Sequence, residues 1–416
     1  MKIKLIHLVI GILLVSMNVT GQDKEWENNV VYSESKVPFY ELPDVLVTSE
    51  GKRVTTVQEW EQVRRPQIMG MFAGLIYGRV PEPEQPVTKV YEVISVDKNF
   101  LDGRCTRKHL LIRFSNHRGE VKMHMVVYTP NHASGPVPTL LQISFSGVEN
   151  SGDIGANNVQ SYGNLNSGLP LIYFLNKSFG VAIIHGGEVV SDENGFGGNS
   201  IQRLYYHGNQ SLPRADEWGV LGGIAWQASR AMDYLETDTD VDKSRVAILG
   251  FSKLGKSALW AAAMDTRFAM AFSQNSGCGG AALWGRIYGE NMKYTFRNNR
   301  WLCENGRKFV GNEDDLPVDQ HMLLAAIAPR PVYITSGIDD NWADPMGEYL
   351  SAHFATPVFE LYGLTGQPSP ERPKLNEPSE DRALSYVVRT SGHGYFQSDW
   401  DRYIKCMEFH FKKQGK

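Results

Sequence analysis

The chain has 416 residues, of which 42% are hydrophobic and 21% are charged. That balance is typical of a packed soluble protein and excludes a disordered, collagen-like or coiled-coil chain. The 42 Lys and Arg residues and the 46 Asp and Glu residues give a net charge of −4, so no nucleic-acid partner is expected.

The first 21 residues have the pattern of a secretory signal peptide. The basic residues Lys2 and Lys4 precede an apolar run over 5–17, and small or polar residues follow up to Gln22. The apolar run is too short to span a bilayer, and no later run approaches about 20 apolar residues. A buried N-terminal helix is the alternative. We expect residues 1–21 to be a signal peptide and the protein to be secreted or periplasmic, without a membrane span.

The four cysteines do not form a recognisable scaffold. They include no C-x-x-C pair, which excludes a zinc ribbon. Export would permit a disulfide, for example between Cys278 and Cys303, but four cysteines allow three pairings and the sequence does not choose among them. No His, Asp or Glu cluster has the spacing of metal ligands, so neither a metal nor an organic cofactor is expected.

Residues 22–95 are polar and rich in proline, and we interpret them as an N-terminal extension that wraps around the core. Within them, residues 56–77 are expected to form an amphipathic helix with Trp60 and Val63 on its buried face. The remaining residues, 96–416, are expected to form one catalytic domain.

In that domain, short apolar runs alternate with helical segments. The expected strands are 121–128, 139–145, 180–185, 245–249, 331–335 and 385–389, and the clearest helices are 218–236 and 396–411. This alternation indicates a mostly parallel central sheet with helices on both faces, a three-layer α/β sandwich.

Ser252 is the candidate nucleophile because it lies between an apolar strand, which ends at Gly250, and an Ala-rich helix. A strand–serine–helix turn raises the hydroxyl above the sheet, where the helix N-terminus and backbone N–H groups stabilise an oxyanion. The usual G-x-S-x-G spacing is not met: Leu254 takes the place of the second glycine, and Gly255 follows it. The alternative is a serine that only caps the helix.

In a hydrolase of this fold the acid and then the histidine follow the serine along the chain. His393, between two glycines on the loop after the last expected strand, is the candidate base. Four other histidines lie in the expected signal peptide or in expected helices: His7, His321, His353 and His410. The acidic turn after strand 331–335 carries three candidate acids, Asp339, Asp340 and Asp344.

The segment from Gly250 to Lys256 resembles the G-C-S-R-x-G-K nucleophile signature of the glucuronoyl esterases, carbohydrate esterase family 15. Other segments resemble the bacterial branch of this family, in the right order: 214–219, 275–283, 289–290, 316–322, 328–331, 342–345, and His393 with Asp399 and Trp400. The resemblance implies an α/β-hydrolase fold and cleavage of the ester between 4-O-methyl-glucuronic acid of xylan and lignin alcohols.

The resemblance also assigns roles to residues by position. It makes Ser252 the nucleophile and His393 the general base, and it gives the uronate sugar three binding residues: Lys256, Glu290 and Trp342. The alternative for Lys256 is an ordinary lysine on a helix surface. The alternative for Glu290 is a helical i, i+4 pair with Arg286 that supports the loop.

The chain departs from the family pattern at the acid. Many members have Glu where Asn275 stands, and an amide cannot compensate the charge of an imidazolium. The acid is therefore expected to be Asp340, which matches an alternative family position. Asp339 is its nearby rival, and Asp344 is expected to cap the next helix.

Two further departures surround the nucleophile. The residue after it is usually Arg, assigned to the oxyanion hole, and here it is Lys253, which keeps the charge but loses the planar fork. Many fungal members flank the serine and the histidine with two bridged cysteines, and here Phe251 and Gly394 exclude that bridge.

We therefore expect an exported bacterial serine esterase that acts, as a monomer, on glucuronoxylan or a lignin–carbohydrate ester. One alternative is an esterase for another carbohydrate ester, acetyl or methyl, with the same triad. The other is a carbohydrate-binding protein on a hydrolase scaffold that has lost its activity.

Overall fold

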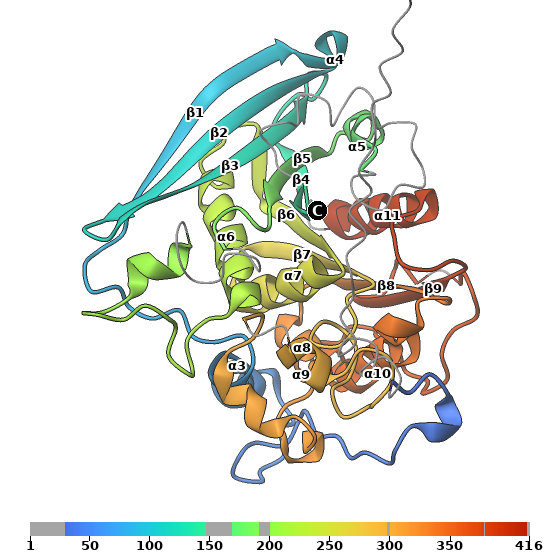
Figure 1. The fold of residues 1–416 in the computed structure, drawn as a ribbon. Coiled ribbons are helices and arrows are strands. Elements are labelled where there is room, and N and C mark those ends of the chain that lie inside the picture. The colour runs from blue at the N-terminus through green and yellow to red at the C-terminus, as the bar shows by residue number, and fades with distance from the viewer. Residues whose placement is uncertain (1–29, 147–168, 191–199, 298–299, 378, 414–416) are drawn as a thin grey trace, which may run out of the picture.

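The structure is a computed structural model that describes residues 30–146, 169–190, 200–297, 300–377 and 379–413 (Figure 1). The expected signal peptide lies outside these ranges. Within them, no helix combines the length and the apolar character needed to cross a membrane.

A nine-stranded sheet runs through the molecule in the order β1-β2-β3-β5-β4-β6-β7-β8-β9. The first three strands are antiparallel and β3 pairs antiparallel with β5, while all pairs from β5 to β9 are parallel. The strands are β1 (Thr88–Asn99), β2 (Cys105–Asn116), β3 (Gly119–Pro130), β4 (Val137–Ser144), β5 (Gly180–His185), β6 (Val241–Phe251), β7 (Phe268–Gln274), β8 (Val332–Gly337) and β9 (Leu384–Arg389).

Helices cover both faces of this sheet and enclose two apolar cores. One core joins the sheet to α3 (Arg65–Leu75), α6 (Val220–Leu235), α7 (Lys253–Met264), α9 (Gln320–Ile327) and α10 (Pro345–Leu361). The other joins it to α5 (Leu171–Asn176) and α11 (Gln397–Lys413). The remaining short helices are η1 (Glu34–Lys36), α2 (Val57–Glu59), η2 (Trp60–Arg64), α4 (Phe100–Gly103), η5 (Ile201–Tyr205), α8 (Met292–Arg297), η6 (Glu304–Phe309), η7 (Glu313–Asp315) and η8 (Asn341–Ala343). The expected three-layer α/β architecture is confirmed.

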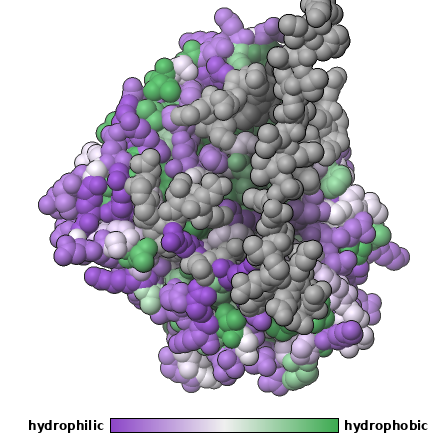
Figure 2. All heavy atoms as spheres, viewed as in Figure 1, coloured by the Kyte–Doolittle hydropathy of each residue, from purple (hydrophilic) through white to green (hydrophobic). Residues whose placement is uncertain are grey.

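All six expected strands are present, and the two clearest expected helices are α6 and α11. The expected boundary between residues 95 and 96 is wrong, because it falls inside β1. β1 escaped prediction because it is an edge strand with exposed residues on both faces, among them Val90, Val93, Ile94 and Val96. Figure 2 shows apolar side chains at the upper left, where Figure 1 places this strand.

The extension contains the expected helix as α2, η2 and α3, but its buried face differs from the prediction. Trp60 is fully buried, whereas Val63 is 43% exposed. The helix widens to a π turn over η2, so Arg64 turns inward in place of Val63 and donates from Nε to the carbonyl of Val45 at 3.1 Å. Arg65 donates to the carbonyls of Ala263 and Ala326, which fixes the extension against the ends of α7 and α9.

The example disulfide between Cys278 and Cys303 is not formed. All four cysteines are free and buried: Cys105, Cys278, Cys303 and Cys406. Burial raises the pKa of the Cys303 thiol to about 11, so it stays protonated at neutral pH.

The turn that carries Ser252 has a strained backbone held by close packing. Ser252 has φ 54° and ψ −128°, a conformation that non-glycine residues rarely adopt. A Cβ atom on Gly250 would lie 2.1 Å from the Leu254 carbonyl oxygen, and one on Gly255 would lie 2.9 Å from the Ser276 Cβ. The glycine at 255 thus permits close packing even though the usual spacing is shifted by one residue.

We predict that Gly250→Ala lowers the free energy of unfolding by about 2–4 kcal/mol, because β6 and the first turn of α7 must separate to admit the methyl group. Urea unfolding measures the loss. Gly70→Ala is the control, since Gly70 is exposed in α3 and its Cβ would meet nothing within 4 Å; it should change stability by about 0–1 kcal/mol in the stabilising direction. Equal effects of the two changes would contradict this view of the turn.

Candidate active site

His393 and Asp340 meet at the carboxyl ends of neighbouring parallel strands. Asp340 follows β8, His393 follows β9, and these strands pair in parallel. The imidazole Nδ1 lies 2.7 Å from Asp340 Oδ2. Because a carboxylate accepts hydrogen bonds, Nδ1 carries the proton and Nε2 is left as an acceptor. The imidazole is 39% exposed and the carboxylate only 5%, so the candidate base is open to solvent and the candidate acid is buried.

The structure separates the three candidate acids. Asp340 contacts His393, whereas Asp339 is exposed. Asp344 caps α10, as expected, by accepting from the Gly347 N–H at 3.0 Å, and it pairs with Arg286 at 3.0 Å. Burial raises the pKa of Asp344 to about 6 against the opposing effect of Arg286.

Asn275 stands where many family members have a glutamate, and it forms a hydrogen bond to the Asp340 carboxylate. It follows β7 with φ 46° and is 1% exposed. Its Nδ2 donates at 2.6 Å to Asp340 Oδ2, the same oxygen that meets His393. Its Oδ1 accepts from Gln274 Nε2 at 2.7 Å. The amide and the imidazole therefore both hydrogen-bond to Oδ2 of the Asp340 carboxylate.

Aromatic rings connect the turn that carries Ser252 to the loop over residues 390–396, which carries His393 and is called the histidine loop below. Phe251, directly before Ser252, has its ring centroid 4.5 Å from the His393 imidazole and 5.1 Å from the Tyr395 ring. Phe251 also makes an edge contact with Phe145, with the ring centroids 6.2 Å apart. An aromatic contact thus joins the segment of Ser252 to that of His393.

Lys253 lies among aromatic side chains beside Ser252. Its Nζ is 5.9 Å from the centroid of the Phe145 ring and 5.7 Å from that of Trp301. Burial and the nearby Lys253 charge lower the pKa of His185, at the end of β5.

The three expected sugar-binding residues lie together. Lys256 Nζ donates to Glu290 Oε2 at 2.6 Å, and the Glu290 backbone N–H donates to the Trp342 carbonyl at 2.7 Å. Lys256 is 2% exposed and is not a helix-surface lysine. Burial raises the pKa of Glu290 and the Lys256 charge opposes this.

The suggested pair between Glu290 and Arg286 is wrong. Residues 286–290 are not helical, since α8 begins only at Met292, so an i, i+4 contact does not arise. Arg286 instead binds Asp344 and, at 2.6 Å, Glu34 of the extension.

Sequence reasoning missed Glu348, a fully buried carboxylate of α10. It accepts from the backbone N–H groups of Ser276 and Gly277 at 2.8 and 2.9 Å and from the Ser336 hydroxyl at 2.5 Å. It thereby holds the turn that follows Asn275. Burial, with a contribution from the Asp340 charge, raises the pKa of Glu348 to about 7. In the sequence Glu348 looks like any acidic residue in the first turn of a helix.

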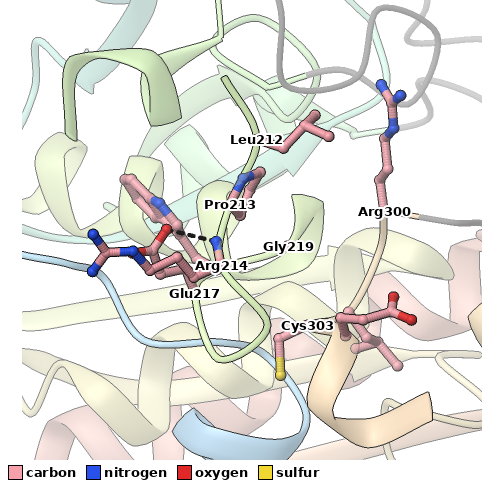
Figure 3. Close-up of a pocket in the computed structure, with 10 residues that line it drawn as sticks. Leu212, Pro213, Arg214, Glu217, Gly219, Arg300 and Cys303 are labelled. Carbon is pink, nitrogen blue, oxygen red and sulfur yellow. Dashed lines mark hydrogen bonds and ion pairs between the residues drawn. The ribbon is translucent and has the colours of Figure 1, made fainter. Parts of the chain in front are cut away.

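A separate cavity of about 260 Å³ is drawn in Figure 3. Its lining comes from residues 212–219 and 300–304, and Glu217 there accepts from the Arg214 backbone N–H at 2.8 Å.

Among the residues that the structure describes, no three His, Cys, Asp or Glu side chains are grouped so that they could hold a metal ion.

Comparison with known proteins gives consistent matches. The family model described as "Glucuronyl esterase, fungi" matches residues 187–363. "Carbohydrate esterase MZ0003", from an unknown prokaryotic organism, is 36% identical over 400 residues that cover 91% of each chain. The glucuronoyl esterase structure from Solibacter usitatus has a TM-score of 0.80 at 35% identity and covers 90% of this chain and 99% of that one. A glucuronoyl esterase from Teredinibacter turnerae T7901 has a TM-score of 0.77 at 28% identity, with 92% of each chain covered.

The fold and these relatives first define a class: the protein is an α/β-hydrolase and a carboxylic ester hydrolase. Within that class it belongs to carbohydrate esterase family 15, the glucuronoyl esterases. The matches do not favour an acetyl esterase or a binding protein without activity.

We predict that Glu348→Gln makes stability less dependent on pH. A carboxyl whose folded pKa is about 7, above its ordinary value of 4.5, contributes stability that is full below about pH 4.5 and is lost as the pH rises through 7. Glutamine does not ionise, so from pH 5 to pH 8 the variant should gain on the order of 1–3 kcal/mol relative to the parent protein.

Urea unfolding at pH 5, 6, 7 and 8 measures this difference. Glu360→Gln, an exposed change on the same helix, is the control and should show a constant difference. A Glu348→Gln difference that is the same at every pH would contradict the assignment.

Proposed function

We propose that the protein hydrolyses the ester between a (4-O-methyl-)glucuronic acid of xylan and a lignin alcohol, with Ser252, His393 and Asp340 as its triad. One observation carries the proposal: the His393 imidazole meets the Asp340 carboxylate at 2.7 Å, beside the strained turn that presents Ser252. Family membership supports the substrate class.

The proton movements follow from the tautomer of His393. Its Nε2 accepts the Ser252 proton as Oγ attacks the ester carbonyl carbon, and the proton then passes to the leaving alcohol. The Asp340 carboxylate stabilises the imidazolium that exists between these two transfers. Water then attacks the uronoyl ester on Ser252, with His393 as its base, and this releases the uronic acid.

Two kinds of group would stabilise the oxyanion of the tetrahedral intermediates. The backbone N–H of the residue after the nucleophile is a usual donor in this fold, and here that residue is Lys253 at the N-terminus of α7. The Lys253 ammonium adds a positive charge. We expect it to act as a point charge, because it lacks the bidentate geometry of arginine.

Lys256, Glu290 and Trp342 would bind the sugar as one unit. Glu290 uses Oε2 for Lys256, which leaves Oε1 to accept from a sugar hydroxyl. The half-buried Trp342 ring, packed edge-on against Tyr294 at 4.5 Å, offers an apolar surface for the pyranose ring. A buried site of this kind discriminates against analogues that lack hydroxyls, since its own groups would then be unpaired.

We further propose that the protein is exported and acts as a monomer. The basic, apolar and then polar order of residues 1–21 supports export. Xylan and lignin lie outside the cell, which agrees with this location.

Hydrolysis of benzyl glucuronate at neutral pH, compared with acetate release from acetylated xylan, tests the function. We expect turnover of the glucuronate ester and little release of acetate. Faster release of acetate would overturn the proposed substrate.

We predict that Ser252→Ala and His393→Ala each remove nearly all activity on benzyl glucuronate while circular dichroism shows a folded protein. Triad members act as a unit, so the double variant should be little worse than either single variant. Fully additive losses would be inconsistent with a shared mechanism.

We predict that Asp340→Asn lowers kcat by about 10²–10⁴-fold, because an amide does not compensate an imidazolium and favours the wrong tautomer. Asp339→Asn is the matched control and should cost far less, since that residue is exposed. Asn275→Glu in the Asp340→Asn background should recover part of the lost activity. The reason is that Asn275 Nδ2 lies 2.6 Å from Asp340 Oδ2, the oxygen that contacts His393, so a carboxylate at position 275 would lie near the imidazole. A fully active Asp340→Asn enzyme would mean that another carboxylate serves as the acid.

A further inference from the structure

Arg389 is the last residue of β9, and the loop that carries His393 connects this strand to α11 (Figure 1). Its side chain is 1% exposed and pairs with Asp399 of α11, which is fully buried. Arg389 Nε lies 3.0 and 3.1 Å from the two Asp399 oxygens. This pairing occupies Nε and leaves both terminal NH₂ groups of the guanidinium for other acceptors.

Those two groups bind the backbone on either side of His393. One donates to the Gly392 carbonyl at 3.0 Å and the other to the Gly394 carbonyl at 2.6 Å. The loop belongs to no helix or strand, and Ser391 has φ 107°, which residues other than glycine rarely adopt. Because the loop lacks the hydrogen bonds of a helix or strand, those from the guanidinium hold its backbone in place.

The second NH₂ group also reaches the support of the acid. It donates at 3.2 Å to Asn275 Oδ1, and Asn275 Nδ2 in turn donates to Asp340 at 2.6 Å. The guanidinium is thus bonded to both sides of the contact between His393 and Asp340: to the backbone that carries the imidazole, and to the amide that fixes the carboxylate.

The surroundings restrict the guanidinium to this orientation. The Phe396 ring covers it at 4.2 Å from its carbon Cζ to the ring centroid. On the neighbouring strand β8, a Cβ on Gly337 would lie 2.9 Å from a terminal nitrogen of Arg389 and 2.5 Å from the Gly392 carbonyl oxygen. An ion pair that served stability alone would not require both terminal groups to be aimed at the histidine loop and at Asn275.

We propose that Arg389 is a positioning residue for the esterase reaction: it sets the distance between His393 and Asp340 by holding the histidine loop and Asn275 on one rigid guanidinium. Arg389 does not touch the substrate and acts through these two residues. The inference rests on the proposed triad of Ser252, His393 and Asp340.

Arg389→Lys tests the proposal, because lysine keeps the charge opposite Asp399 but cannot supply five donors in a planar fork. We expect kcat on benzyl glucuronate to fall about 10–100-fold, as for other small misplacements of catalytic groups, with KM changed less than about twofold, since Lys256 and Glu290 are untouched. The acidic limb of the pH profile of kcat/KM should move to lower pH, because a looser contact with Asp340 stabilises the imidazolium less.

Arg64→Lys is the matched control. Arg64 is also buried, at 4% exposure, and also donates to backbone carbonyls, those of Asp44 and Val45, but in the extension. It should lower the melting temperature and leave kcat and the pH profile unchanged. If both variants lose the same fraction of kcat with unshifted profiles, Arg389 is merely structural and the proposal fails.

The double variant Arg389→Lys with His393→Ala shows whether Arg389 acts through the histidine. Its residual rate should equal that of His393→Ala alone. A further loss on top of His393→Ala would overturn the proposal, as would Arg389→Lys activity within twofold of the parent protein.

Two more comparisons make the outcome decisive. If Arg389→Lys does not fold, Arg389→Met with Asp399→Leu removes both members of the pair and leaves no unpaired buried charge; the same loss of kcat is expected, and normal activity would contradict the proposal. If His393→Ala itself stays active, the proposed triad is wrong. If His393→Ala is inactive while Arg389→Lys is normal, the triad stands and only the role of Arg389 is lost.

Discussion

The contact of 2.7 Å between His393 Nδ1 and Asp340 Oδ2 is the interaction on which the proposed active site depends. It fixes which imidazole nitrogen carries a proton, and so which one accepts the proton from Ser252 in the proposed reaction. The carboxylate is almost completely buried, so its charge must be balanced where it lies. Asn275 supplies a hydrogen bond to it, and in the proposed reaction the His393 imidazolium supplies the positive charge.

Buried polar groups beneath the site maintain this contact. Glu348 holds the turn after β7, and Arg389 holds the loop after β9, so both neighbours of β8 are fixed relative to Asp340. These groups would cost stability if left unpaired. Their hydrogen bonds link strands that adjoin in the sheet but are far apart in sequence, which makes the geometry of the proposed triad a property of the whole parallel sheet.

The parts predicted from the sequence are those with a local signal. Ser252 between a strand and a helix, and His393 between glycines, are visible in a few consecutive residues. The supports of the site are not, because Asn275 and Asp340 are 65 positions apart, and Arg389 meets Asn275 across 114. Two predictions from local patterns were wrong. A π turn exposes Val63, which helical spacing had placed on the buried face. Arg286 pairs with Glu34 and Asp344, which are distant in sequence, and not with Glu290.

Proton NMR of protein labelled with ¹⁵N-histidine tests the central claim most directly, because it detects the proton that His393 shares with Asp340. The structure predicts a low-field Nδ1 proton resonance in the parent protein that is retained in Asp339→Asn and missing from both His393→Ala and Asp340→Asn. If the resonance remained unchanged in Asp340→Asn, the contact at the centre of this site would not be the one that orients the base.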